Sequence, residues 1–164
     1  MNKMEVKLRK YRNNLVTSGW AIIALCLWDN AKIIISLFLN TTYSQMYFDA
    51  FHVDVKLLFV LEIVFTIIFM ALVDFFHFLV GINAIKEGNG NKRRPGYLVV
   101  CVFLFIATAS SVVISAKSIK DLSFDITLAS ILIDGTLAAA LADLFISSVR
   151  IRVISKKTAE GGNR

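Results

Sequence analysis

The chain has 164 residues, 57% of them hydrophobic and 18% charged, with a formal net charge of +6 at pH 7. Its mean hydropathy of +0.68 is too high for a soluble domain with a solvated surface, and its length fits one domain. The basic excess does not indicate a nucleic-acid binder, because the cationic residues flank apolar runs and form no separate soluble domain.

Four apolar runs follow one another along the chain, at residues 15–39, 57–85, 97–116 and 126–149. Each reaches the roughly 20 residues that a helix needs to cross a hydrocarbon core about 30 Å thick. Membrane-spanning strands would instead alternate over about 10 residues, and no such pattern is present. The sequence therefore predicts an all-α, integral membrane four-helix bundle with an antiparallel, up-down-up-down arrangement.

The charged residues outside the runs predict an orientation. Lys and Arg gather in an N-terminal segment (residues 1–14), in the connection after the second run, and in a C-terminal tail (residues 150–164). By the positive-inside rule these three segments, and so both termini, are cytoplasmic. We expect a multi-pass protein of the plasma membrane, with 15–149 as its transmembrane domain and anionic lipids at its cytoplasmic face. The tail "KTAEGGNR" has the composition of a frayed end.

Two further patterns concern how the helices connect and pack. The segment "EGNGNKRRPGY", residues 87–97, holds three glycines and the only proline, which predicts the turn of a hairpin. Small residues four apart, Gly135 with Ala139 and Ala107 with Ser111, predict close packing of the third and fourth helices.

Charged residues within the apolar runs indicate a polar interior. Asp29 and Lys32 are three apart on one helix face. Glu62 and Asp134 enter their own runs to a depth similar to that of Lys32, so the four side chains can meet in the outer half of the bundle. Three carboxylates against one lysine leave a surplus of negative charge, which must be protonated, hydrated or matched by a bound cation. These four residues are the candidate ion or ligand site. The alternative is that Lys32 pairs with Asp29 or Glu62 only to hold the helices together.

A second group lies in the inner half. Asp74 and His77 are three apart on the second helix, and Asp143 reaches a similar level on the fourth. They form a candidate proton-responsive group, since histidine changes charge between about pH 5 and 8. Asp134 and Asp143 are nine residues apart, about half a turn out of phase, so we expect them to face different neighbours.

The motifs of several enzyme classes are missing from the sequence. No CxxC pair, phosphate-binding loop or paired intramembrane histidine is present, and we assign no catalytic, cofactor-binding or metal-ligating residue. The favoured hypothesis is a membrane protein that binds or conducts a cation or a proton, as a homo-oligomer because four helices enclose little volume. One alternative is a non-transporting membrane interaction or regulatory subunit. A weaker one is a lipid-modifying membrane enzyme that uses Asp74, His77 and Asp143.

Overall fold

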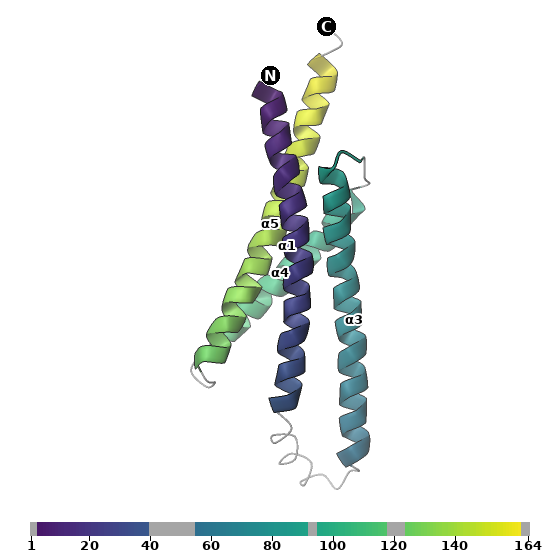
Figure 1. The fold of residues 1–164 in the computed structure, drawn as a ribbon, viewed down its shortest axis with the longest axis vertical. Helices are drawn as coiled ribbons and strands as arrows, with labels where there is room; N and C mark the ends of the chain where they lie inside the picture. The colour runs from purple at the N-terminus through teal and green to yellow at the C-terminus, as the bar shows by residue number, and fades with distance from the viewer. Residues whose placement is uncertain (1–2, 40–54, 92–94, 118–123, 162–164) are drawn as a thin grey trace.

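The computed structural model describes residues 3–39, 55–91, 95–117 and 124–161, and all the regular structure there is α-helical (Figure 1). The helices are α1 (Lys3–Leu39), α3 (Val55–Gly88), α4 (Gly96–Lys117) and α5 (Phe124–Gly161). The predicted all-α class with four helices is therefore confirmed for the described part of the chain. Both termini lie at one end of the molecule (Figure 1).

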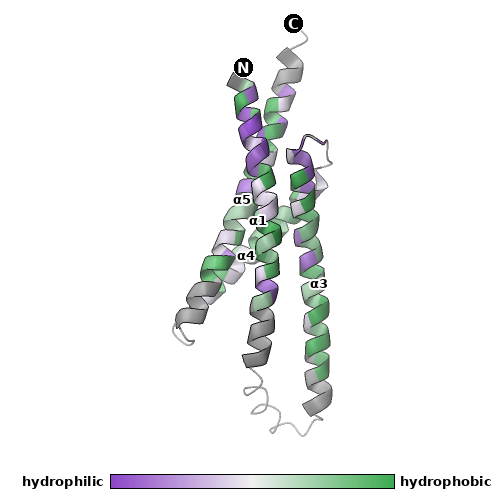
Figure 2. Ribbon diagram, viewed as in Figure 1, coloured by the Kyte–Doolittle hydropathy of each residue, from purple (hydrophilic) through white to green (hydrophobic). Residues whose placement is uncertain are grey.

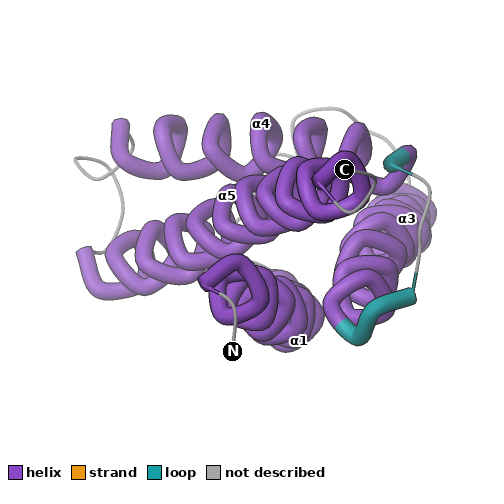
Figure 3. Tube along the Cα trace, turned by 90° about the horizontal axis from the view of Figure 1, so that it is seen from above, coloured by secondary structure: helices purple, strands orange, loops and turns teal. Residues whose placement is uncertain are grey.

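The helices pack as consecutive pairs and also join the first helix to the last. α1 packs mainly against α3 and α5, and α4 packs mainly against α5. Seen from the end that carries the termini, α5 lies between α1 and α4 (Figure 3). The core is mostly aliphatic, drawn from all four helices, and includes Leu15, Ile22, Val80, Leu98, Leu137, Leu141 and Leu144.

Two of the described helices are long and apolar enough to cross a membrane, over Ile63–Gly88 and Gly96–Lys117. Only 11% of the most apolar window of each is buried, so neither resembles the covered central helix of a soluble protein. Figure 2 shows hydrophilic residues gathered near the termini and the α3–α4 connection, while α3 becomes apolar toward its other end. That residues 15–39 and 126–149 also cross a membrane stays a prediction.

α1 and α5 extend beyond their apolar runs. α1 begins at Lys3 rather than at residue 15, and α5 ends at Gly161 rather than at residue 149. The prediction that residues 157–164 form a frayed end is therefore wrong for residues 157–161, which are helical. A helix satisfies its own backbone hydrogen bonds in water as well as in lipid, and Lys and Arg favour helix, so neither helix needs to end at a membrane boundary.

The predicted hairpin turn begins with a glycine cap. Gly90 has a φ of +93°, and its N–H donates to the Glu87 carbonyl while the Asn91 N–H donates to the Lys86 carbonyl. This pair of bonds is the Schellman motif, which closes a helix on a left-handed residue. It ends α3 sharply, so that the last turn of α3 lies beside the first turn of α4.

The backbones of α1 and α3 approach closely at glycines. A methyl group placed on Gly81 would lie 2.7 Å from Ile23 Cγ1 and 2.9 Å from the Gly19 carbonyl oxygen. A methyl group on Gly88 would lie 2.6 Å from Val16 Cγ2. The sequence analysis predicted close packing of the third and fourth helices, and α4 does pack against α5. Gly135 takes no part in a close contact, because nothing lies within 4 Å of a methyl group there.

The glycine contact generates a test with an internal control. We expect Gly81→Ala to lower the free energy of unfolding by about 1–3 kcal/mol, because the added methyl group meets backbone that must shift. Gly135→Ala removes an equally flexible glycine from a helix but meets open space, so stability stays equal or rises by up to about 1 kcal/mol. Thermal unfolding in detergent, followed by circular dichroism, compares the two. Equal melting temperatures would show that the α1–α3 contact is looser than the structure indicates.

Candidate functional site

Asp74 of α3 is hydrogen-bonded by two donors of α1. The Cys26 thiol lies 2.9 Å from Asp74 Oδ1, and Asn30 Nδ2 donates to Oδ2 at 2.7 Å. Cys26 and Asn30 are four residues apart and so share one face of α1, which lets both reach a single carboxyl group. Both donors are neutral. They satisfy the oxygens of Asp74 without neutralising a charge.

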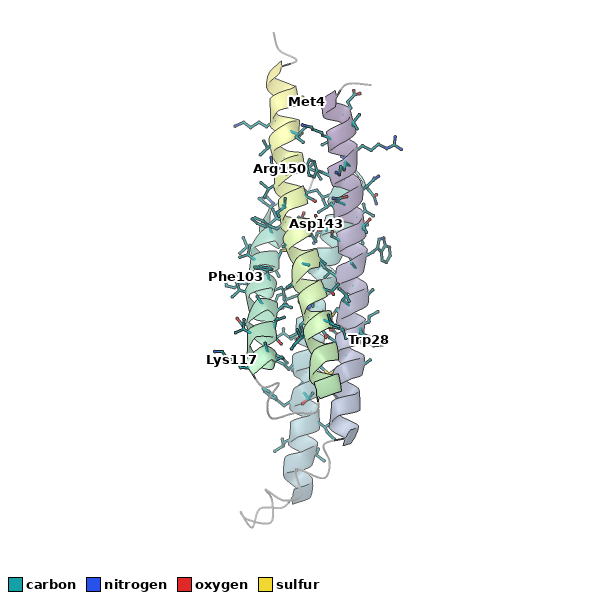
Figure 4. All side chains as sticks on the ribbon, turned by 90° about the vertical axis from the view of Figure 1, so that its left-hand side faces the viewer. Met4, Trp28, Phe103, Lys117, Asp143 and Arg150 are labelled. Atoms are coloured by element: carbon teal, nitrogen blue, oxygen red, sulfur yellow. The ribbon has the colours of Figure 1, made fainter. Side chains whose placement is uncertain are left out.

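Asp134 and Asp143 of α5 face different helices, as their half-turn offset predicts. Asp143 accepts a hydrogen bond from Ser18 Oγ of α1 at 2.6 Å. Asp134 is buried and accepts one from Ser111 Oγ of α4 at 3.0 Å. Figure 4 shows Asp143 on the side of α5 toward α1, while Phe103 of α4 points away from the bundle. Each of these acids is again held by a neutral hydroxyl donor on a neighbouring helix.

His77 is buried and keeps one ring nitrogen without a protein partner. Its exposed fraction is 5%, and its Nδ1 lies 2.9 Å from the carbonyl oxygen of Val73 on the same helix. A carbonyl oxygen only accepts, so Nδ1 carries a proton. The other nitrogen, Nε2, is buried and has no hydrogen-bond partner among the described residues.

A fourth acid, Glu87, was not singled out by the sequence analysis. Tyr97 Oη donates to its Oε2 at 2.6 Å, and Ser148 Oγ donates to its Oε1 at 3.0 Å. Arg152 completes the cluster with two bonds, from Nε to Oε1 at 3.2 Å and from Nη2 to Oε2 at 2.8 Å. Glu87 of α3 is therefore a buried carboxylate with one cation and four hydrogen bonds, whose donors lie on α4 and α5. We call these four residues the Glu87 cluster.

One signal in the sequence marks Glu87 as buried. Val80, Ala84 and Glu87 recur at spacings of four and three, so Glu87 continues the apolar face of α3. This signal was overlooked because Glu87 follows the exposed Lys86 beside a glycine-rich turn, where a charged residue is normally solvated. Arg152 was read only as one of the basic residues that set the orientation.

The predicted outer group is described in part. The side chains of Lys32 and Glu62 lie outside the described residues, so the meeting of these two with Asp29 and Asp134 stays a prediction. Asp29 is half-buried on α1. Asp134 faces α4 through Ser111, a partner that the sequence analysis did not anticipate.

The three residues of the predicted inner group, Asp74, His77 and Asp143, each bond to a separate partner. Asp74 and His77 share a face of α3, but Asp74 bonds to α1 and His77 to its own backbone. Asp143 bonds to Ser18, next to the Gly19–Gly81 contact, which places it one turn beyond His77 along the bundle. The ionisable groups thus occupy successive levels, in the order Asp74, His77, Asp143 and Glu87.

This series of levels, which we call the polar ladder, extends over much of a membrane's thickness. Asp74 and Glu87 are thirteen residues apart on α3, which corresponds to about 20 Å along the helix. Within the described residues, no three His, Cys, Asp or Glu side chains are placed to hold a metal ion together. The arrangement favours hydrogen-bond and proton chemistry at separate levels over coordination of an ion at one point.

Comparisons with known proteins add no relative. No family model, curated protein or solved structure matches this chain.

The Glu87 cluster generates a stability test. Arg152→Met strands a buried carboxylate, and we expect it to lower the free energy of unfolding by about 2–3 kcal/mol, less than for a fully buried pair because Arg152 is 32% exposed. Adding Glu87→Gln removes the stranded charge and restores part of that loss. Arg150→Met, at an exposed position two residues away, is the matched control, with an effect below about 0.5 kcal/mol. Equal losses for the two arginine variants in detergent melts would contradict the cluster.

Proposed function

We propose that this chain is a multi-pass membrane protein that moves protons along the polar ladder between α1, α3 and α5. The observation that carries the proposal is the chemistry of the ladder's partners. Asp74 and Asp143 each receive hydrogen bonds from neutral thiol, amide or hydroxyl donors of α1, with no cation among these bonds. Ionisable groups inside a membrane are costly, and they characteristically mark proton or ion pathways.

Two buried atoms fall in the gaps of the ladder. His77 Nε2 lies between the levels of Asp74 and Asp143, and Ser147 Oγ lies one turn beyond Asp143, next to the Ser148 that bonds Glu87. Neither atom has a hydrogen-bond partner in the described part of the chain. Buried polar groups normally find a partner in protein or water. A water molecule or a transferred proton at these two atoms would join the separate levels into one path.

The surface of the bundle supports a place in lipid. α3 and α4 expose large apolar side chains, including Phe65, Ile68, Phe69, Phe75, Phe103, Ile106 and Ile114. In water an apolar surface of this extent would drive aggregation, whereas in a bilayer it is solvated. The proposal takes all four helices as antiparallel spans of a plasma membrane, with both termini in the cytoplasm and anionic lipid around the basic end.

A proton fits this interior better than a dehydrated metal cation. Cations such as Na⁺ and Ca²⁺ require several oxygen acceptors around one point. The donors that face Asp74 and Asp143 direct hydrogens rather than lone pairs at the carboxyl groups. A hydrated ion would also need a wider path, such as one between two copies of the chain. A proton needs only successive groups that both donate and accept.

A second candidate function is that of a non-transporting membrane subunit that binds a partner protein. It is favoured by the exposed aromatic residues of α3, which suit a helical partner as well as lipid. In this case the polar ladder would only hold the helices in register. The two candidates differ in whether the purified chain alone carries a proton flux.

Reconstitution into liposomes distinguishes them. The vesicles enclose a pH-sensitive dye, and a potassium diffusion potential set with valinomycin drives protons inward. We expect dye acidification above the rate of empty vesicles. Asp143→Asn should reduce it to that background, because the amide oxygen still accepts the Ser18 hydrogen bond but takes up no proton.

The control is Ser110→Ala, which removes an exposed hydroxyl that bonds only to its own helix, and which should leave the flux unchanged. A wild-type flux equal to that of empty vesicles would remove the transport proposal and favour the subunit. An Asp143→Asn flux equal to wild type would show that protons do not use the ladder.

A further inference from the structure

His77 is held in one neutral tautomer by its own helix. Its Nδ1–H donates to the Val73 carbonyl at 2.9 Å, and its Nε2 is buried without a partner among the described residues. In the neutral ring Nε2 therefore carries the free lone pair. A protonated ring keeps the same Nδ1–H bond to Val73. The two protonation states of His77 thus differ only at Nε2, and neither requires the ring to move.

The level of His77 along the bundle axis follows from the contacts on either side. Cys26 bonds Asp74 one turn before His77, and Gly19 meets Gly81 one turn after it. Ser18, next to Gly19, bonds Asp143. His77 therefore lies between two carboxyl groups from different helices, about 4.5 Å from the level of Asp74 and about 6 Å from that of Gly81 along the axis.

Acidic groups predominate around this level. The titratable side chains described on the four helices near His77 are Asp74 and Glu87 of α3, Cys26 and Asp29 of α1, Asp134 and Asp143 of α5, and Tyr97 and Cys101 of α4. The half-buried cations, Arg12 and Arg152, lie toward the Glu87 end, as do the exposed Lys86 and Arg150. Lys117 is exposed at the far end of α4. An imidazolium at His77 would have carboxyl groups at the levels on either side and, among the described side chains, no cation at its own level.

We propose that His77 Nε2 is the proton acceptor that links Asp74 to Asp143. This inference rests on the proposed function and names the group that carries the proton across the gap. A carboxylic acid on one side loses its proton to Nε2, which leaves a carboxylate and an imidazolium. The imidazolium then gives the Nε2 proton to the carboxylate on the other side. Because Nε2 has no hydrogen-bond partner among the described residues, each transfer passes over an intervening water molecule, and no redox partner is needed.

Solid-state nuclear magnetic resonance of ¹⁵N-histidine-labelled protein in lipid bilayers tests the assignment. The chain has two histidines, so His52→Gln leaves His77 as the single imidazole in the spectrum. At about pH 8 we expect a protonated Nδ1 and a bare Nε2, and at about pH 5 we expect Nε2 to be protonated while Nδ1 is unchanged. A bare Nδ1 at high pH, or an Nε2 that stays bare at low pH, would overturn the proposal.

The flux assay separates this inference from the proposed function. In liposomes His77→Gln should reduce the proton flux toward that of Asp143→Asn, because the amide cannot carry a proton on and off. If Nε2 takes up a proton but wild-type vesicles show no flux, the transport function fails and the protonation site stands. If the flux persists in His77→Gln, the transport function stands and His77 is not its carrier.

Discussion

A carboxyl group removed from water needs hydrogen-bond donors. In this bundle they come from a helix other than the one that carries the acid. α1 supplies Ser18, Cys26 and Asn30 to acids of α3 and α5, and α4 supplies Ser111 and Tyr97. Because unmade hydrogen bonds in an apolar interior are costly, each of these contacts resists sliding of one helix past another. The aliphatic core fills space but is less selective, since Leu and Ile side chains can repack.

The glycine contact brings donors of α1 within reach of Asp74 on α3. At Gly19 and Gly81 the backbones of α1 and α3 approach so closely that a single methyl group would not fit. Asp74 lies two turns from Gly81 on α3, so the short side chains of Cys26 and Asn30 reach it directly from α1. Close backbones are a general way to bring small polar side chains together in membrane helices, where lipid provides no hydrophobic drive for association.

Much of this architecture was predictable from local pattern, and the rest depends on which faces meet. Long apolar runs predict helices, and the angular offset of Asp134 and Asp143 predicts that they face different neighbours. The burial of Glu87 and its pairing with Arg152 were not predicted, because charged residues at the end of an apolar run usually indicate orientation rather than burial. The Gly19–Gly81 contact was not predicted, because a single glycine in a helix does not indicate which helix it packs against. Gly135, which belongs to a small-residue pattern, has no atom within 4 Å of an added methyl group. The companions of Lys32 and Glu62 stay predictions.

The central claim is that acids inside the bundle exchange protons while the helices hold them in place. Infrared difference spectroscopy of the protein in lipid bilayers observes this directly, because a protonated carboxyl group has a carbonyl absorption that a carboxylate lacks. On acidification we expect such an absorption to grow, and one component of it to be missing from Asp143→Asn, while acids at the surface give the same signal in both proteins. Identical pH-dependent spectra for wild type and Asp143→Asn would show that Asp143 does not change its protonation, and would contradict a proton path through the bundle.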